Sequence, residues 1–153
     1  GHGALSTTLA ALPVYAAAGL PMIVIGALPD AVPAQAGVFV LSPSQATLDA
    51  CARAAGRDCA EGVDPGASAD ADRALAGFAE VSGGAGPSRG SAIAYEATRL
   101  AIAAIQTAAR NGAPTRAGVA AALTTIEAQG VLGTIHFDRN GRWLEAPAYP
   151  IDP

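Results

Sequence analysis

The sequence predicts a single α/β lobe in which a small, mostly parallel sheet is flanked by helices and followed by a C-terminal β-hairpin. Its length of 153 residues suits one domain with a sizeable core. Hydrophobic residues make up 51% of the chain and charged residues 14%, a balance typical of a chain that packs rather than of a disordered one. Apolar runs of strand length alternate with segments of helical period, which favours the α/β class.

The first part of the chain predicts a helix followed by a buried strand. Hydroxyl side chains at 6–8 can cap a helix over about residues 7–18, and Gly19 is typical of the position after a helix end. The apolar run that follows Gly19, at residues 21–25, is unbroken. Such a run indicates a strand buried on both faces of a parallel sheet.

A second strand and helix follow, and then the composition changes. Residues 38–41 form another short apolar run, and Ser42-Pro43-Ser44 predicts the start of a helix that continues to about Ala55. Residues 57–90 are rich in Gly, Ala and Asp and are interpreted as a connection, with one short helical stretch at 71–80.

The second half predicts two helices and a hairpin. Residues 91–110 carry apolar side chains at spacings of three and four, and residues 115–128 repeat this pattern after Pro114. Residues 131–137 are predicted as a strand, with a turn at 138–141 that contains the Asn-Gly hairpin signal, and residues 142–151 as the partner strand.

Charge and hydropathy exclude two classes of partner. The net charge is −4, and all nine basic residues are Arg, so a nucleic-acid interface is not expected. Residues 1–29 contain no charged side chain, but Pro13, Gly19 and Pro21 interrupt them, and no basic segment precedes them. We therefore expect neither a membrane span nor a signal peptide within this chain; a signal for export would have to precede Gly1.

The cysteines and histidines do not predict a metal site. Cys51 and Cys59 lack the paired spacing of a zinc site, and His2 and His136 lie at opposite ends of the chain. The cysteines lie eight residues apart around Gly56. Two interpretations stay open: a local disulfide in an oxidising compartment, or two small buried apolar side chains.

No catalytic motif is apparent in the sequence. Residues 84–91 have the glycines and serines of a phosphate loop but no Lys and no preceding strand, and Asp64, Asp70 and Asp72 lack the spacing of a calcium loop. His136 alternates with apolar neighbours and is expected on the outward face of a strand. We therefore expect no enzyme activity and no cofactor.

Four segments of the sequence, in this order, resemble a known family. They are Gly1–Thr8 with Pro13–Ile23, Val38–Ala46, Ala94–Ala97 and Gly130–Gly141. The matching pattern has a Gly-His turn, a Ser/Thr-rich helix start and a Tyr before a strand, then a further strand and helix, a Tyr-Asp-Ala helix and a closing Gly-x-Ile-x-Phe-Asp-x-x-Gly hairpin. These segments are similar to the first lobe of the type 1 periplasmic solute-binding proteins, in the branch that binds branched-chain amino acids.

The resemblance implies a function, a location and a domain organisation. Residues 1–153 would form one lobe of an extracytoplasmic receptor that binds an amino acid or related solute and delivers it to an ABC permease. The second lobe of the family would be inserted within residues 57–90, where this chain has only a short connection. The alternative is a sensor or protein-interaction domain that keeps the same scaffold without transport.

The resemblance also implies a set of binding residues. In the family, hydroxyl side chains and backbone groups hold the ligand at the helix start and in the loop after the next strand. Matched by position, the helix hydroxyl falls on Leu5 and the loop Thr falls on Leu28, so both polar anchors are replaced. Backbone and hydroxyl groups nearby can still meet a carboxylate at a helix N-terminus. The expected site comprises Leu5, Ser6, Thr7, Gly26, Ala27 and Leu28.

The first testable prediction concerns nucleic acid. With acidic charge in excess and no Lys, we expect DNA and RNA to migrate unshifted in a gel-shift assay at low salt, where phosphate attraction is strongest. Tight binding in that assay would contradict the interpretation of the charge pattern.

Overall fold

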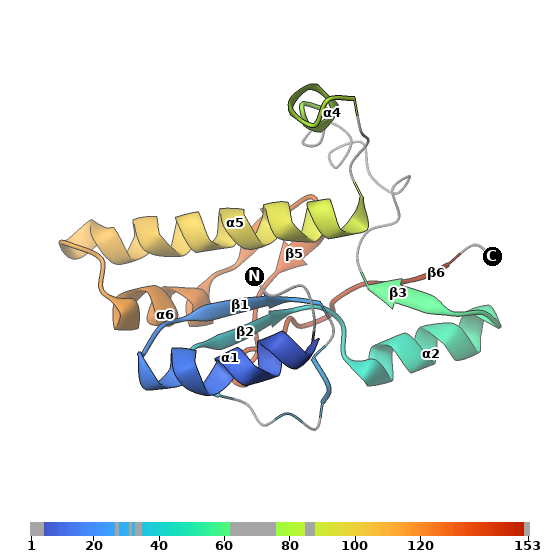
Figure 1. The fold of residues 1–153 in the computed structure, drawn as a ribbon, viewed down its shortest axis with the longest axis horizontal. Coiled ribbons are helices and arrows are strands. Elements are labelled where there is room, and N and C mark those ends of the chain that lie inside the picture. Colours follow the sequence, from blue (N-terminus) through green and yellow to red (C-terminus); the bar gives the residue numbers. More distant parts are fainter. Residues whose placement is uncertain are drawn as a thin grey trace.

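Short strands between helices make up the fold, which confirms the predicted α/β class. A computed structural model describes residues 5–26, 28–30, 32, 35–61, 76–84 and 88–151. The elements follow one another as α1 (Leu5–Ala17), β1 (Met22–Ile25), β2 (Val38–Leu41), α2 (Gln45–Ala55), β3 (Cys59–Glu61), α4 (Phe78–Val81), α5 (Arg89–Ala108), the 3-10 turn η1 (Ala109–Asn111), α6 (Arg116–Thr125), β4 (Ala128–Gly130), β5 (Gly133–Ile135) and β6 (Ala148–Pro150) (Figure 1).

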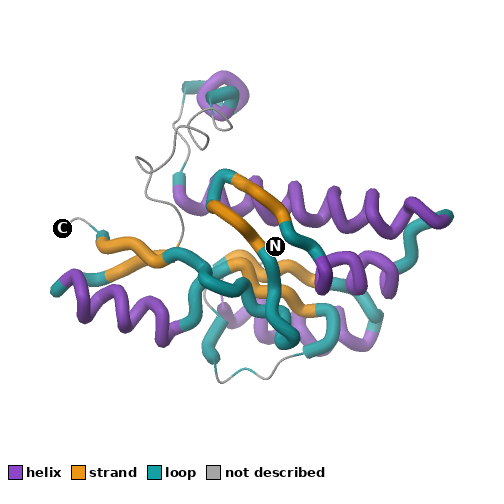
Figure 2. The backbone as a smooth tube through the Cα atoms, turned by 180° about the vertical axis from the view of Figure 1, so that it is seen from behind, coloured by secondary structure: helices purple, strands orange, loops and turns teal. Residues whose placement is uncertain are grey.

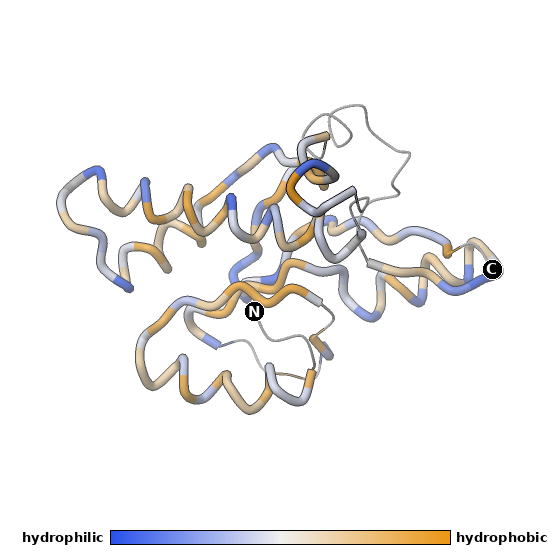
Figure 3. The backbone as a smooth tube through the Cα atoms, turned by 45° about the horizontal axis from the view of Figure 1, so that its top comes forward, coloured by the Kyte–Doolittle hydropathy of each residue, from blue (hydrophilic) through white to orange (hydrophobic). Residues whose placement is uncertain are grey.

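The core is built on the parallel pair β1–β2. Met22 lies opposite Val38 and Ile25 opposite Leu41, so the strands start and end together. Because side chains alternate along a strand, each strand presents one apolar set to each face. Met22, Val24, Val38 and Val40 pack with Leu12 of α1. Figure 3 shows this apolar pair between α1 on one side and α5 and α6 on the other.

The other face of the pair packs against α5 and α6. Phe39 and Leu41 of β2 join Leu100 and Ala104 of α5 and Leu123 of α6 in one buried cluster. Serine and threonine caps set the starts of these helices: Ser88 forms a capping box with Ser91, and the Thr115 side chain accepts the Gly118 N–H. The predicted helices at 91–110 and 115–128 are therefore present, with shifted bounds.

The predicted hairpin differs in detail from the observed one. Residues 131–137 do not form a single strand, because β4 pairs antiparallel with β5 and the chain turns at Val131 and Leu132. Both turn side chains are buried in the α5–α6 cluster, so their apolar character serves the core rather than a strand. The Asp138–Gly141 turn does reverse the chain, and Phe137 then bridges Trp143 antiparallel.

The C-terminal strand has a different partner from the predicted one. β6 pairs antiparallel with β3, which lies about ninety residues earlier, so the described strands form three two-stranded sheets (Figure 2). The predicted connection 57–90 thus contains β3 and α4. Residues 62–75 and 85–87 lie outside the described residues. The place where a second lobe would be inserted therefore stays a prediction. The same holds for the first half of the short helix expected at residues 71–80.

A buried carboxylate fastens the β4–β5 hairpin to α5. Glu96 is 1% exposed, and its Oε1 accepts the Val131 N–H at 2.9 Å and the Arg99 guanidinium at 3.1 Å. Gly130 lies directly against this carboxylate, where a Cβ atom would overlap it. The hairpin is therefore held to α5 by a buried carboxyl group.

Glu96→Ala should lower the free energy of unfolding by about 1–3 kcal/mol, because it leaves the buried Val131 N–H without its acceptor. Arg99→Met is the comparison variant: the Arg99 side chain is 45% exposed and its partner Glu96 is 1% exposed. We expect it to cost less than Glu96→Ala, because the buried carboxyl group keeps the Val131 N–H as a donor. Urea unfolding of both variants measures the difference. Equal losses would mean that the ion pair, not the Val131 contact, stabilises the hairpin.

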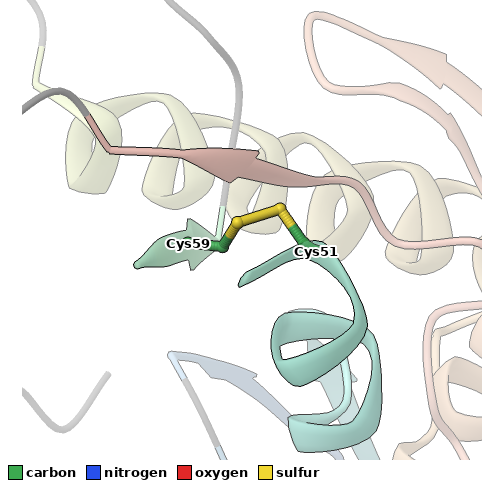
Figure 4. The surroundings of a disulfide bond; sticks show 2 residues. All are labelled: Cys51 and Cys59. Atoms are coloured by element: carbon green, nitrogen blue, oxygen red, sulfur yellow. A yellow bond between two sulfur atoms is a disulfide. The ribbon is translucent and has the colours of Figure 1, made fainter. Parts of the chain in front are cut away.

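The α2–β3 unit has little core of its own. None of the α2 residues is buried. Its ends are set by the Ser44 side chain, which accepts the Thr47 N–H, and by Gly56, whose φ of +67° suits glycine. Cys51 of α2 and Cys59 of β3 are joined by a disulfide, with Cα atoms 6.0 Å apart (Figure 4). The disulfide therefore compensates in part for the lack of buried side chains in α2.

In protein from an oxidising compartment we expect the intact mass to be two hydrogens lower than after reduction. Replacing Cys51 and Cys59 by Ala should destabilise α2 and β3 by about 2–3 kcal/mol, the loop-closure effect of a cross-link of this span. Two free thiols in secreted protein would refute this expectation.

Candidate functional site

The parallel strands end together, and this carboxyl edge is where ligands of open α/β sheets commonly bind. Ile25 and Leu41 are opposite each other at the ends of β1 and β2. The residues that follow are tied together, because the buried Ser42 hydroxyl donates to the Gly26 carbonyl at 2.9 Å. The two chains therefore leave the sheet at a fixed separation.

The first turn of α1 lies at the same edge. After α1 the chain reverses at Gly19, where the Leu20 N–H donates to the Tyr15 carbonyl at 2.9 Å, and α1 packs antiparallel to β1 through Leu12. Its start therefore points to the side on which β1 ends (Figure 1). The first N–H groups of a helix have no acceptor within it and carry partial positive charge.

The helix starts earlier than the sequence predicts. The expected bounds were 7–18 with hydroxyl caps, whereas α1 begins at Leu5, so Ser6 and Thr7 lie within its first turn. Both are exposed, and Leu5 is 43% exposed. Two exposed hydroxyl residues and an exposed apolar residue therefore lie side by side in the first turn of α1.

The loop after β1 contributes backbone rather than side chains. Gly26 has a φ of +112°, a conformation that suits glycine and lets a ligand approach the main chain closely. Leu28 is 4% exposed and packs in the α1 cluster, so its side chain points into the core. Ala27 lies outside the described residues.

Sequence reasoning missed one contributor to this edge. Arg142, in the turn after β5, donates to the carbonyls of Leu28 and Pro29 at 3.0 and 3.1 Å and pairs with Asp30 at 3.3 Å. A charged residue beside an Asn-Gly turn gives no local signal for such a contact, because its partners lie more than a hundred residues away. Among the described residues, the edge therefore holds an Arg–Asp pair next to the loop that follows β1.

Two hollows lie away from this edge and are largely apolar. One, of about 580 Å³, lies between α4 and α5 and is lined by residues that include Phe78, Val81 and Tyr95. The other, of about 370 Å³, lies between β1, α5 and α6. The Thr98 hydroxyl, which borders both, donates to the Ala94 carbonyl within α5. Neither arrangement supplies an acid–base pair.

Other side chains considered from the sequence do not assemble a reactive site. His136 is half-buried rather than turned outward, and its Nδ1 is enclosed without a hydrogen-bond partner among the described residues. No cluster of three His, Cys, Asp or Glu side chains that could hold a metal occurs in the described part of the chain. Asp64, Asp70 and Asp72 lie outside that part. Within residues 84–91, which lack the Lys of a phosphate loop, Ser88 caps α5.

None of the helices that the structure describes combines the length and apolar character needed to cross a lipid bilayer.

No model of a known protein family and no curated protein sequence matches this chain. A similar solved structure is an ABC transporter substrate-binding protein from Desulfitobacterium hafniense, with 15% sequence identity and a TM-score of 0.48. The similarity covers 95% of this chain and 40% of that protein, so this chain spans less than half of its length. The resemblance to branched-chain amino-acid receptors stays a prediction.

Proposed function

We propose that this chain is a solute-binding lobe that holds a small carboxylate ligand, such as an amino acid, at the carboxyl edge of β1 and β2. The observation that carries the proposal is the convergence of the α1 first turn with the ends of both strands (Figure 1). The N–H groups at a helix start attract a carboxylate, and Gly26 allows close approach to the backbone.

The four family-like segments supply the biological setting of the proposal. They include the residues of the α1 start, the β2–α2 junction and the Asp138–Gly141 turn. A lobe of this kind would act outside the cytoplasm and pass its solute to an ABC permease, without chemical change to the solute.

The proposed site is a weak one. A single lobe covers its ligand from one side only, whereas good small-molecule sites bury most of the ligand. Leu5 and Leu28 also offer no hydroxyl, and each missing hydrogen bond costs roughly 0.5–1.5 kcal/mol. The exposed Leu5 and, one turn later, the exposed Leu9 favour the second candidate function, in which this apolar start of α1 contacts a protein partner.

For leucine, isoleucine and valine we expect dissociation constants no tighter than about 1 mM, which corresponds to −4.1 kcal/mol. Titration followed by amide NMR gives both the affinity and the location, and the shifted amides should be those of residues 5–7 and 26. A micromolar affinity would show that Leu5 and Leu28 are matched to the wrong family positions.

Leu5→Thr should tighten leucine binding about two- to tenfold, because it returns one hydroxyl to the edge. Leu9→Thr is the matched control, since Leu9 is similarly exposed one turn further along α1. An equal change in both variants, or none in Leu5→Thr, would argue against a ligand at this edge and favour the protein-interaction alternative.

A further inference from the structure

One arginine side chain contacts three successive residues at the candidate site, two through their backbone carbonyls and one through its carboxylate. Arg142 Nη1 donates to the Leu28 carbonyl at 3.0 Å, and Nη2 donates to the Pro29 carbonyl at 3.1 Å. Nη1 also lies 3.3 Å from Asp30 Oδ1. The planar guanidinium presents its donors in a fixed fork, so paired contacts define direction as well as distance.

The backbone of Arg142 is itself anchored to the central strand. Asp138 Oδ1 accepts the Arg142 N–H, and the Asp138 N–H donates to the Arg142 carbonyl, each at 2.8 Å. On either side, the Gly141 carbonyl accepts the Val40 N–H at 2.7 Å and the Trp143 N–H donates to the Val40 carbonyl at 3.1 Å. Arg142 is therefore held alongside β2 by the hydrogen bonds that its two neighbours make with Val40.

Gly141 makes this close anchoring sterically feasible. Its φ is +73°, and a Cβ atom at this position would overlap the Val38 carbonyl of β2. The Asn-Gly turn thus serves two purposes: it reverses the chain and it brings Arg142 alongside the strand.

We infer that Arg142 is a positioning residue for the candidate binding edge, acting through the carbonyls of Leu28 and Pro29 and the side chain of Asp30. This inference rests on the proposed function for its biological meaning, because the backbone of these residues continues from Gly26 at the end of β1. The guanidinium uses both terminal nitrogens on protein acceptors, and its side chain is 21% exposed. It acts on the loop and not on the ligand.

A backbone hydrogen bond in the same loop supplies a readout of loop order that does not depend on ligand binding. The Val32 N–H donates at 2.9 Å to the Pro29 carbonyl, the same oxygen that Arg142 Nη2 holds. Loosening this carbonyl should speed the hydrogen exchange of the Val32 amide. The Leu20 amide, bonded to Tyr15 in the turn after α1, is an internal reference remote from Arg142 in sequence.

The experiment measures amide exchange and leucine affinity in the full chain and four variants. Arg142→Met keeps the apolar stem and removes the fork, and should speed Val32 exchange about tenfold while Leu20 exchange stays unchanged. Arg142→Lys, which can satisfy one carbonyl at a time, should fall between Met and the original chain. Asp30→Asn removes the ion pair but keeps the carbonyl contacts, and should change exchange less than twofold.

Arg139→Met is the matched control, because Arg139 is an exposed arginine in the same turn. We expect it to leave both readouts unchanged. Leucine affinity should fall about threefold or more in Arg142→Met and also in part in Arg142→Lys, since a retained positive charge does not replace the fork.

The outcomes separate this inference from the proposed function. Unchanged Val32 exchange in Arg142→Met, or an equal change in Arg139→Met, overturns the positioning role whatever the chain binds. Full leucine affinity in Arg142→Lys beside a loss in Arg142→Met also overturns it, because that pattern marks a direct ionic contact. Faster Val32 exchange in a chain that shows no amino-acid binding supports the positioning of residues 28–30 and refutes the proposed function.

Discussion

The burial of β2 on every side is the constraint on which the rest of the fold depends. All four of its residues are buried: Val38 and Val40 face α1, whereas Phe39 and Leu41 face α5 and α6. One edge pairs with β1 and the other bonds to residues 141–143. A strand enclosed in this way must satisfy its backbone through neighbours, because water cannot reach it. The need to cover and pair β2 therefore fixes where α1, β1 and the turn before Arg142 lie.

Local sequence patterns predict the centre of this arrangement well. Apolar runs identify β1 and β2, because a strand covered on both faces needs apolar residues at every position. Hydroxyl caps at Ser44 and Thr115 mark helix starts, because a side-chain oxygen must replace the missing acceptor. These signals are local, so one sequence suffices to find them.

Features that depend on distant partners are not predictable in the same way. β3 and β6 have three residues each, too few for a periodic pattern, and their pairing joins segments about ninety residues apart in the sequence. From the sequence alone, Glu96 would be expected on an exposed helix face. Only the fold shows that it accepts the Val131 N–H in a buried position. At the candidate site, the expected residues of α1 and Gly26 were identified from the resemblance, but the inward side chain of Leu28 and the role of Arg142 required the fold.

The composition of the chain explains why backbone geometry matters so much at this edge. Charged residues make up 14% of the sequence and Lys is absent, so few side-chain donors are at hand to meet an anion. In the proposed function, recognition would depend on main-chain N–H groups, which have no rotamers with which to adjust to a ligand. Such groups are effective only where the chain is fixed before the ligand arrives, since ordering it afterwards costs about 1–2 kcal/mol per residue. Two side chains next to β2 fix this part of the chain. Ser42 donates to the Gly26 carbonyl, and Arg142 donates to the carbonyls of Leu28 and Pro29. The order of the proposed site therefore depends on the stability of the core around β2.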